Sequence, residues 1–344
     1  MVKFMERYSR KITKAYDMAD IHVNLPLSSM SVAFMQSLDE FIADKVFAKI
    51  PVPSQTGKYY RFARDAFTRA RGRKWVPGTP MAQSSFDLDS TPEYSCEFRA
   101  FEHPLRWDIA MHADSQINFD RSVTEYITRA LLIGREEEFV DNFFKTGVWG
   151  TEYTGVANGA NSTQFVYWDD PIDSNPVADV IKMCETIKRT SLMKPNVMVM
   201  PLRVFNTIRL HPIIKDYFKY TQVPVITEDM MAKVFGLDKI YVAQALHTTT
   251  EEGMTMDVDA TTTDFDWIFT DDVFIGYVPT SPSIMMPASG YTFNFTGLSA
   301  GYDITIQKFP EPRYKVDYTQ GLLCYDQKIV SKSTGGFLHG VLTP

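Results

Sequence analysis

The sequence predicts an α+β protein organised around one long helix. Residues 119–146 repeat apolar side chains at steps of three and four, which is the pattern of an amphipathic helix. From residue 173 onward, short helical patterns alternate with strand-like runs, and strands alone return from residue 304. The chain has 344 residues, of which 44% are apolar, so it can bury a large core and has room for two domains of ordinary size.

Composition excludes several broad classes of protein. The 24 Phe, 17 Tyr and 5 Trp are too many for an intrinsically disordered chain. No run of about eighteen residues is apolar enough to cross a membrane, and the first seven residues lack the apolar core of a signal peptide. Cys96, Cys184 and Cys324 are widely spaced and form no CxxC pair, which favours a reducing compartment without disulfides or a zinc ribbon. We therefore expect a protein that is made and folds in a cytoplasm.

The net charge of −7 is distributed unevenly along the chain. Residues 1–75 carry 14 Lys and Arg against 7 Asp and Glu, a net charge of +7, so the remainder carries −14. Phosphate binding needs concentrated positive charge, which argues against nucleic-acid binding by the chain as a whole. The positive charge of the N-terminal fifth needs an explanation of its own.

The N-terminal residues predict an extended arm. Residues 1–20 are basic and polar, and residues 24–30 are typical of an extended, non-helical segment. Apolar residues at helical spacing then predict a short amphipathic helix within 30–48.

Residues 49–104 predict a long two-stranded loop with a basic, irregular tip. Prolines bracket two strand-like runs, at 59–64 and at 93–101. About thirty residues separate these runs, and they include the basic segment 69–74. Two strands cannot bury enough surface to be stable alone, so we expect this loop to lie on another surface.

The helix expected over residues 119–146 has recognisable ends. Ser122 and Glu125 have the spacing of a capping box, and Gly147 follows Lys145 as a helix stop. At about 1.5 Å per residue such a helix is roughly 40 Å long, which suits a spine more than a compact core helix.

The C-terminal half predicts helices and strands in alternation. Asn175 and Pro176 have the residue types of a helix start, and a helix capped by Thr227 is expected to end at Gly236. Another helix is expected around Val204, Phe205 and Ile208. Strands are expected at 196–200, 240–243, 265–269, 273–278, 304–306 and 322–325.

One ordered series of short motifs carries a resemblance to a known family. The segments are Lys194-Pro195-Asn196-Val197-Met198-Val199-Met200, Leu210-His211-Pro212, Ile226-Thr227-Glu228-Asp229 and Phe235-Gly236-Leu237-Asp238-Lys239-Ile240-Tyr241-Val242. In this order, and following Trp168-Asp169, they resemble the major capsid proteins of tailed bacteriophages, which have the Hong Kong 97-type fold that encapsulins share. The resemblance covers most of the chain.

The resemblance implies a domain order along this sequence. It implies an N-terminal arm at 1–48, an extended loop at 49–104, a peripheral domain with a spine helix at 105–172, an axial domain at 173–303 and a completion of the peripheral domain at 304–344.

The resemblance implies a structural protein that assembles into hexamers and pentamers of an icosahedral phage head around double-stranded DNA. It also implies a location in the virion after assembly in the host cytoplasm, with no membrane. A cementing or decoration protein, a scaffold and a portal are the further partners it suggests, besides non-specific contact with packaged DNA. An encapsulin-like shell around a cargo enzyme is the alternative. An unrecognised soluble enzyme is the third hypothesis.

The basic residues of the loop are the candidate inter-subunit contacts. These are Arg61, Arg64, Arg69, Arg71, Arg73 and Lys74. Together with nearby aromatic residues they could bind nucleic acid. The strongly acidic remainder of the chain favours a second interpretation, in which they pair with an acidic surface of a neighbouring subunit.

Motifs for catalysis or metal binding are missing from the sequence. The six histidines show no HxxxH or HExxH spacing, and there is no GxSxG, GxGxxG or GxxxxGK[ST] motif. His211 before Pro212 is interpreted as a helix cap, and Cys184 as a small core residue. The acidic residues of 249–272 lack the glycine and the final Glu of a calcium loop, so a solvated acidic loop is expected. We expect no enzyme, no metal and no cofactor.

Some members of the family join a loop Lys to an Asn of a neighbouring peripheral domain by an isopeptide bond. Lys58 and Lys74 are candidate lysines here, but residues 296–344 contain no Asn, and Asn294 precedes them. The sequence therefore predicts a shell without covalent cross-links.

Overall fold

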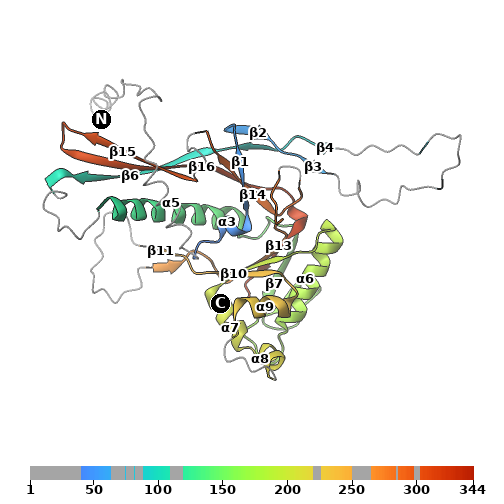
Figure 1. Ribbon diagram of the computed structural model, residues 1–344. Helices are drawn as coiled ribbons and strands as arrows, with labels where there is room; N and C mark the ends of the chain where they lie inside the picture. Colours follow the sequence, from blue (N-terminus) through green and yellow to red (C-terminus); the bar gives the residue numbers. More distant parts are fainter. Residues whose placement is uncertain are drawn as a thin grey trace, which may run out of the picture. The chain divides into compact units, whose positions relative to one another are not determined.

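The computed structural model describes residues 40–62, 74, 81, 88–108, 119–219, 226–249, 265–283, 286–297 and 303–344 (Figure 1). The chain divides into two compact units. Of the described residues, unit 1 comprises those within 98–131 and 297–323, and unit 2 comprises those within 40–97, 132–296 and 324–344. Helix α5 (Phe119–Phe143) and strand β16 (Val316–Ile329) contribute residues to both units.

Unit 1 combines the first half of α5 with an antiparallel sheet. The sheet strands are β6 (Glu97–Arg106), β15 (Ile304–Glu311) and the first part of β16. Strand β15 pairs with β16 from Ile304 opposite Leu323 to Glu311 opposite Val316. A side chain at Gly321 would place its Cβ 2.4 Å from Ile127 of α5, so glycine lets this helix approach the sheet closely.

The larger sheet of unit 2 has six strands in the order β10-β9-β13-β17-β7-β8. The strands are β7 (Thr151–Val156), β8 (Gln164–Val166), β9 (Val197–Pro201), β10 (Lys239–Ala243), β13 (Val273–Gly276) and β17 (Gly335–His339). All five residues of β9 are buried, which is typical of a central strand that is covered on both faces.

Helices cover one face of this sheet, where they pack against Met198, Met200, Ile275 and Leu338. They are α6 (Pro176–Ser191), α7 (Leu202–Leu210), α8 (Pro212–Phe218) and α9 (Glu228–Phe235). Buried residues of these helices, including Met183, Phe205 and Phe235, form one core cluster with the fully buried Trp168. The Trp168 indole donates a hydrogen bond of 3.1 Å to Asp179 of α6, so its one polar atom has a partner.

Strands β1 (Ala48–Val52), β14 (Gly290–Phe295), β16 and β15 form, in this order, one sheet that β6 joins by pairing with β16, and its unit 2 part connects the N-terminal part of the chain to the C-terminal part. Strand β1 pairs in parallel with β14, and β14 pairs antiparallel with the second half of β16. The short helix α3 (Ala43–Val46) leads into β1. A short 3-10 helix, η2 (Lys332–Thr334), connects β16 to β17.

Three two-stranded ribbons complete unit 2. Strand β2 (Thr56–Lys58) pairs with β5 (Glu93–Ser95), and β3 (Arg61–Phe62) pairs with β4 (Leu88–Asp89). The third ribbon pairs β11 (Leu246–Thr248) with β12 (Phe265–Trp267).

Several predicted elements are confirmed at their ends. The Asn175 side chain accepts a hydrogen bond of 3.1 Å from the Ala178 amide, with Pro176 in the first turn of α6. His211 ends α7 and begins α8, where its Nδ1 accepts from the Ile213 amide at 3.3 Å. Gly236 ends α9 in the left-handed region, at φ +70°.

One predicted helix start and one predicted capping hydrogen bond need correction. Helix α5 begins at Phe119, so Ser122 lies inside it and the predicted capping box is wrong: the apolar periodicity extends upstream of the polar pair. Thr227 stands at the start of α9, but its side chain makes no capping hydrogen bond.

Of the helix predicted within 30–48, the described part is helical only over Ala43–Val46, because the chain turns at Phe47 into β1.

Candidate assembly surfaces

The base of the extended loop rests on β14 through aromatic side chains. The Tyr94 ring stacks on the Phe293 ring with 4.5 Å between centroids and 14° between planes. The Tyr59 ring lies 5.4 Å from the same phenylalanine. All three residues are buried, so Phe293 anchors both sides of the loop. We call Tyr59, Tyr94, Cys96, Phe293 and Asp326 the loop base.

Hydrogen bonds fix the register of the loop base. The Ser95 amide donates to Asp326 of β16 at 2.8 Å, and the Cys96 thiol donates to the Phe293 carbonyl at 3.4 Å. Burial, with smaller contributions from Cys324 and Asp326, raises the pKa of Cys96 to about 12. The thiol therefore stays protonated at neutral pH and is a poor nucleophile.

A glycine makes the aromatic stacking feasible. Gly57 lies directly opposite Tyr94 in the β2–β5 pairing. A Cβ at Gly57 would lie 2.5 Å from the Tyr94 hydroxyl oxygen and 2.7 Å from the ring carbon that bears it. Only glycine leaves the room for Tyr94 to lie flat across β2.

The structure places two of the six predicted contact residues. Arg61 is exposed on β3, with its guanidinium 5.6 Å from the Tyr59 ring centre and its Nη2 donating to the Tyr59 hydroxyl at 3.2 Å. Lys74 is exposed. The other four, Arg64, Arg69, Arg71 and Arg73, lie outside the described residues. Arg61 thus belongs to the edge of the loop base as well as to the basic run.

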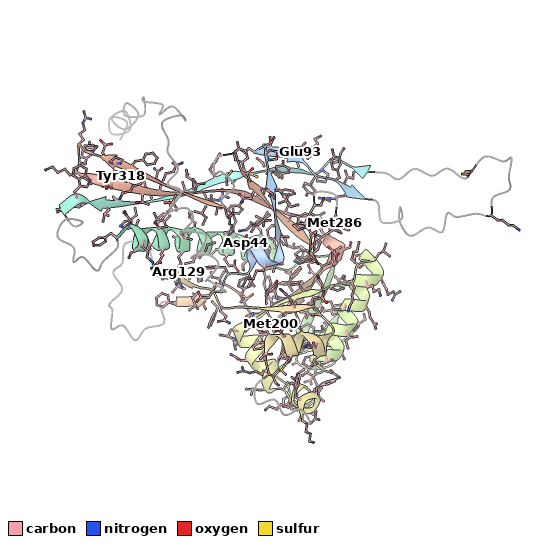
Figure 2. The ribbon with its side chains drawn as sticks, viewed as in Figure 1. Asp44, Glu93, Arg129, Met200, Met286 and Tyr318 are labelled. Carbon is pink, nitrogen blue, oxygen red and sulfur yellow. The ribbon has the colours of Figure 1, made fainter. Side chains whose placement is uncertain are left out.

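A second site joins α3 to α5 within unit 2. The Glu136 carboxylate accepts one hydrogen bond from the Ile42 amide at 2.9 Å and another from the Ala43 amide at 3.0 Å. The neighbouring Arg135 side chain is only 2% exposed and is paired with Asp44, which also pairs with Lys49 at 2.9 Å. We call these residues of α5 and α3 the α3–α5 junction; Figure 2 labels Asp44 there.

The α3–α5 junction contains an unusual titratable group. Burial raises the pKa of Glu136 from 4.5 to about 7, and the Asp44 carboxylate also raises it. The two backbone amides and Arg135 oppose this rise. On β16, the Tyr325 hydroxyl donates to Glu138, and its ring centre lies 5.8 Å from the Arg135 guanidinium. The pKa of the Glu136 carboxyl therefore lies near neutrality.

The sequence analysis missed the α3–α5 junction. Residues 135–138 read Arg-Glu-Glu-Glu, which is typical of a solvated helix face. The position of Glu136 in the helical repeat was a signal that could have revealed its burial. It falls in line with the apolar Leu132, Phe139 and Phe143, all of which are buried.

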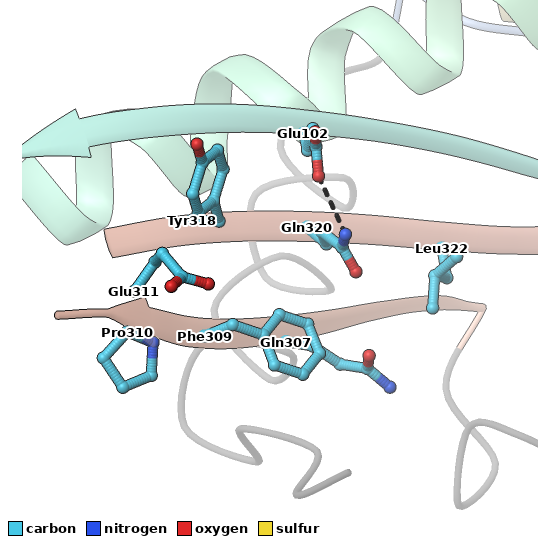
Figure 3. Close-up of a pocket in the computed structure, with 8 residues that line it drawn as sticks. All are labelled: Glu102, Gln307, Phe309, Pro310, Glu311, Tyr318, Gln320 and Leu322. Carbon is cyan, nitrogen blue, oxygen red and sulfur yellow. Dashed lines mark hydrogen bonds between the residues drawn. The ribbon is translucent and has the colours of Figure 1, made fainter. Parts of the chain in front are cut away.

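Unit 1 carries a groove of about 520 Å³ on its antiparallel sheet (Figure 3). The lining residues come from β6, β15 and β16: Glu102, Gln307, Phe309, Pro310, Glu311, Tyr318, Gln320 and Leu322. The Gln320 amide donates to Glu102 at 2.8 Å. The groove combines aromatic surface with two acidic side chains.

Two further findings concern the described residues. No helix there is long and apolar enough to cross a membrane. No three His, Cys, Asp or Glu side chains gather there in a way that could hold a metal ion.

Comparison with known proteins identifies the fold. No protein-family model matches the chain. A phage-related protein from Bordetella bronchiseptica has a similar structure, with a TM-score of 0.70 and 21% identity over 94% of this chain and 99% of that protein. A chain from the capsid structure of the cyanophage P-SCSP1u matches with a TM-score of 0.51 and 9% identity, over 85% of this chain and 86% of that chain. The chain has the Hong Kong 97-type capsid fold.

A curated relative with a named role also matches by sequence. The major capsid protein of Burkholderia phage BcepMu is 20% identical over 233 residues, which cover 67% of this chain and 71% of the relative. The BcepMu protein is a structural protein of a phage capsid. The resemblance predicted from the motifs at 168–242 is confirmed.

Proposed function

We propose that the chain is the major subunit of a tailed-phage head, assembling as hexamers and pentamers into an icosahedral shell around double-stranded DNA. The match with the major capsid protein of phage BcepMu over two thirds of both chains carries this proposal. The loop base supports it, since a buried aromatic anchor holds a loop whose β3 end is exposed.

The same proposal assigns roles to the parts of the sequence. Residues 1–48 are the N-terminal arm, 49–104 the extended loop, 105–172 and 304–344 the peripheral domain, and 173–303 the axial domain. The loop lies over the adjacent subunit and buries well over about 2,000 Å² per subunit in total, as obligate interfaces do. Scaffold, portal and cementing proteins, and non-specific contact with packaged DNA, complete the proposed set of partners.

Electron microscopy of the purified protein tests the assembly. We expect rings of five and six subunits and closed shells, which are DNA-filled when isolated from phage-infected cells. A folded monomer at all concentrations, with residues 55–95 resistant to protease, contradicts the proposal. Small shells filled with a cargo protein favour the encapsulin alternative instead.

The basic loop tip gives the next prediction. Changing Arg69, Arg71 and Arg73 together to Glu is expected to block shell assembly while leaving the subunit folded. Each exposed ion pair contributes only about 0.2–1 kcal/mol, so a triple reversal is needed for a clear effect. The measurement is sedimentation of the assembled fraction, with circular dichroism as the folding control. The triple change to Lys is the matched control, because it keeps the charge. Normal particles from the Glu variant refute the prediction.

The shell is expected to be held together without covalent links. The stretch 296–344 offers no Asn amide to a loop lysine, and an acceptor displaced by about 1 Å can cost on the order of 10²-fold in rate. A denaturing gel of mature particles should show a single band near 39 kDa. A ladder of linked multimers contradicts this.

A further inference from the structure

We call the groove on unit 1 the unit 1 groove; it lies on the sheet face that points away from α5. Ile306 of β15 lies directly opposite Gly321 of β16, and a Cβ at Gly321 would lie 2.4 Å from Ile127 of α5. These two residues therefore face the helix. Side chains alternate along a strand, so Gln307 and Gln320, which also lie opposite each other, point to the other face. A ligand can thus occupy the groove without displacing α5.

One polar side chain in the unit 1 groove is buried without a protein partner. Gln307 is 5% exposed, and its side chain lines the groove. Within the described ranges its side-chain amide has no hydrogen-bond partner. The hydrogen bond drawn in Figure 3 joins Gln320 to Glu102 instead. A buried amide costs free energy unless a partner satisfies it, so the Gln307 amide oxygen is an acceptor for a ligand in the groove.

Two carboxylates give the unit 1 groove its charge. Glu102 of β6 accepts a hydrogen bond from Gln320 at 2.8 Å, and Glu311 ends β15. Strands lie about 4.8 Å apart and residues rise about 3.3 Å, so the two backbones are about 10 Å apart across the sheet and about 13 Å along it. In the part of the chain that the structure describes, neither carboxylate has an ion-pair partner. Arg106, further along β6, is held by Asp108 at 3.0 Å. The groove therefore offers two separate anionic groups.

An aromatic pair lies between these two carboxylates. Phe309 of β15 is directly opposite Tyr318 of β16, and both side chains are half-buried. Phe309 stands midway between Gln307 and Glu311 along its strand. Aromatic rings attract alkylammonium groups and pack against methylene groups, whereas Ca²⁺ and Mg²⁺ prefer a shell of oxygen ligands. The unit 1 groove therefore favours an organic cation over a metal ion.

We propose that the unit 1 groove binds a linear aliphatic polyamine, with one ammonium group at Glu102, another at Glu311 and the methylene chain across Phe309 and Tyr318. An amine of the same ligand donates a hydrogen bond to the Gln307 oxygen. The groove volume of about 520 Å³ is that of a small-molecule site. A lysine or arginine side chain of a peptide carries a similar cation, but it brings one charge and a bulky backbone. Two charges linked in one molecule fit two separated carboxylates better.

Equilibrium dialysis with radiolabelled spermidine tests the site. The full chain is produced in the absence of phage DNA and treated with nuclease, because DNA itself binds polyamines. Salt at about 0.1 M limits the reach of distant charges to about 10 Å. We expect saturation at one spermidine per subunit and a Kd at least about tenfold lower than that of n-butylammonium, which has a single charge. Binding that does not saturate, or equal affinity for the two cations, overturns the inference.

Single substitutions locate the bound polyamine. Glu102→Gln and Glu311→Gln should each raise the Kd about threefold to fivefold, and Phe309→Leu, which keeps an apolar side chain without a ring, about twofold to fivefold. Glu93→Gln is the matched control, because it removes the same charge from a side chain of unit 2 that is 68% exposed. It should leave the Kd unchanged. Circular dichroism confirms that each variant is folded. Equal effects of Glu311→Gln and Glu93→Gln would reveal diffuse attraction and overturn the inference.

Competition distinguishes a polyamine site from a metal site or a peptide site. One competitor is Mg²⁺, and the other is a synthetic peptide of residues 64–74, which carries five basic residues of this chain. Neither should displace half of the bound spermidine at a concentration equal to the Kd of spermidine. Displacement by Mg²⁺ at that concentration would assign the groove to a metal ion, and displacement by the peptide would assign it to a protein segment. Either result overturns the inference.

Discussion

Replacing Phe293 by alanine is expected to destabilise the subunit by about 3–5 kcal/mol. The ring is fully buried and contacts Tyr59, Tyr94 and Tyr291, so its removal leaves a cavity that both sides of the loop line. Denaturant unfolding of dissociated subunits measures the loss.

The same substitution should also release the loop base. The Cys96 thiol, which donates to the Phe293 carbonyl, should react with a thiol reagent at least about tenfold faster, since local opening is the route to a buried thiol. Tyr314→Ala is the control, because Tyr314 is 62% exposed and its loss should change stability by less than about 0.5 kcal/mol. Equal stability of Phe293→Ala and Tyr314→Ala would show that the loop base does not anchor the loop.

Stability of the α3–α5 junction is expected to fall as the pH rises towards 8. Burial raises the pKa of Glu136 from 4.5 to about 7, so the folded state binds a proton that the unfolded state releases between these values. The resulting stabilisation is complete below about pH 4.5 and is lost as the pH rises through about 7. This rise in the pKa corresponds to a contribution of roughly 3 kcal/mol to the free energy of unfolding at low pH.

The Glu136→Gln variant isolates this contribution. Its side chain does not ionise, so its free energy of unfolding should depend less on pH between 5 and 8 than that of the wild type. Asp44, Arg135, Lys49 and the Tyr325–Glu138 pair remain in both proteins, and other titrating groups cancel in the comparison. Glu93→Gln is the control, because the Glu93 side chain is 68% exposed and its change should leave the pH profile intact. Parallel profiles for wild type and Glu136→Gln would contradict the prediction.

Much of the fold could be predicted from local patterns. The helix over Phe119–Phe143 follows from a long apolar periodicity, and the strand at Val197–Pro201 follows from a short apolar run that begins after Asn196. The start of α6 follows from the chemistry of Asn175 and Pro176. These features depend on residues close together in sequence, which is why one sequence suffices to find them.

The candidate surfaces were only partly predictable. The loop was expected from its prolines and strand-like runs, but its anchor, Phe293, lies about two hundred residues away from Tyr94. Glu136 looks like a surface carboxylate until the chain at Ile42 and Ala43 is placed over it. The unit 1 groove forms only where β6 meets β15 and β16, which follow it by about two hundred residues. Such features depend on long-range packing, which no local pattern records.

The parallel pairing of β1 with β14 can form only late in translation. Ala48 pairs with Tyr291, so the ribosome must add roughly 240 residues after β1 before its partner exists, on the order of ten to fifty seconds at about 5–20 residues per second. Phe293 belongs to the same late strand. The nascent chain therefore carries β1, Tyr59 and Tyr94 without their partner for most of translation, and the loop gains its anchor only when nearly the whole subunit has been made.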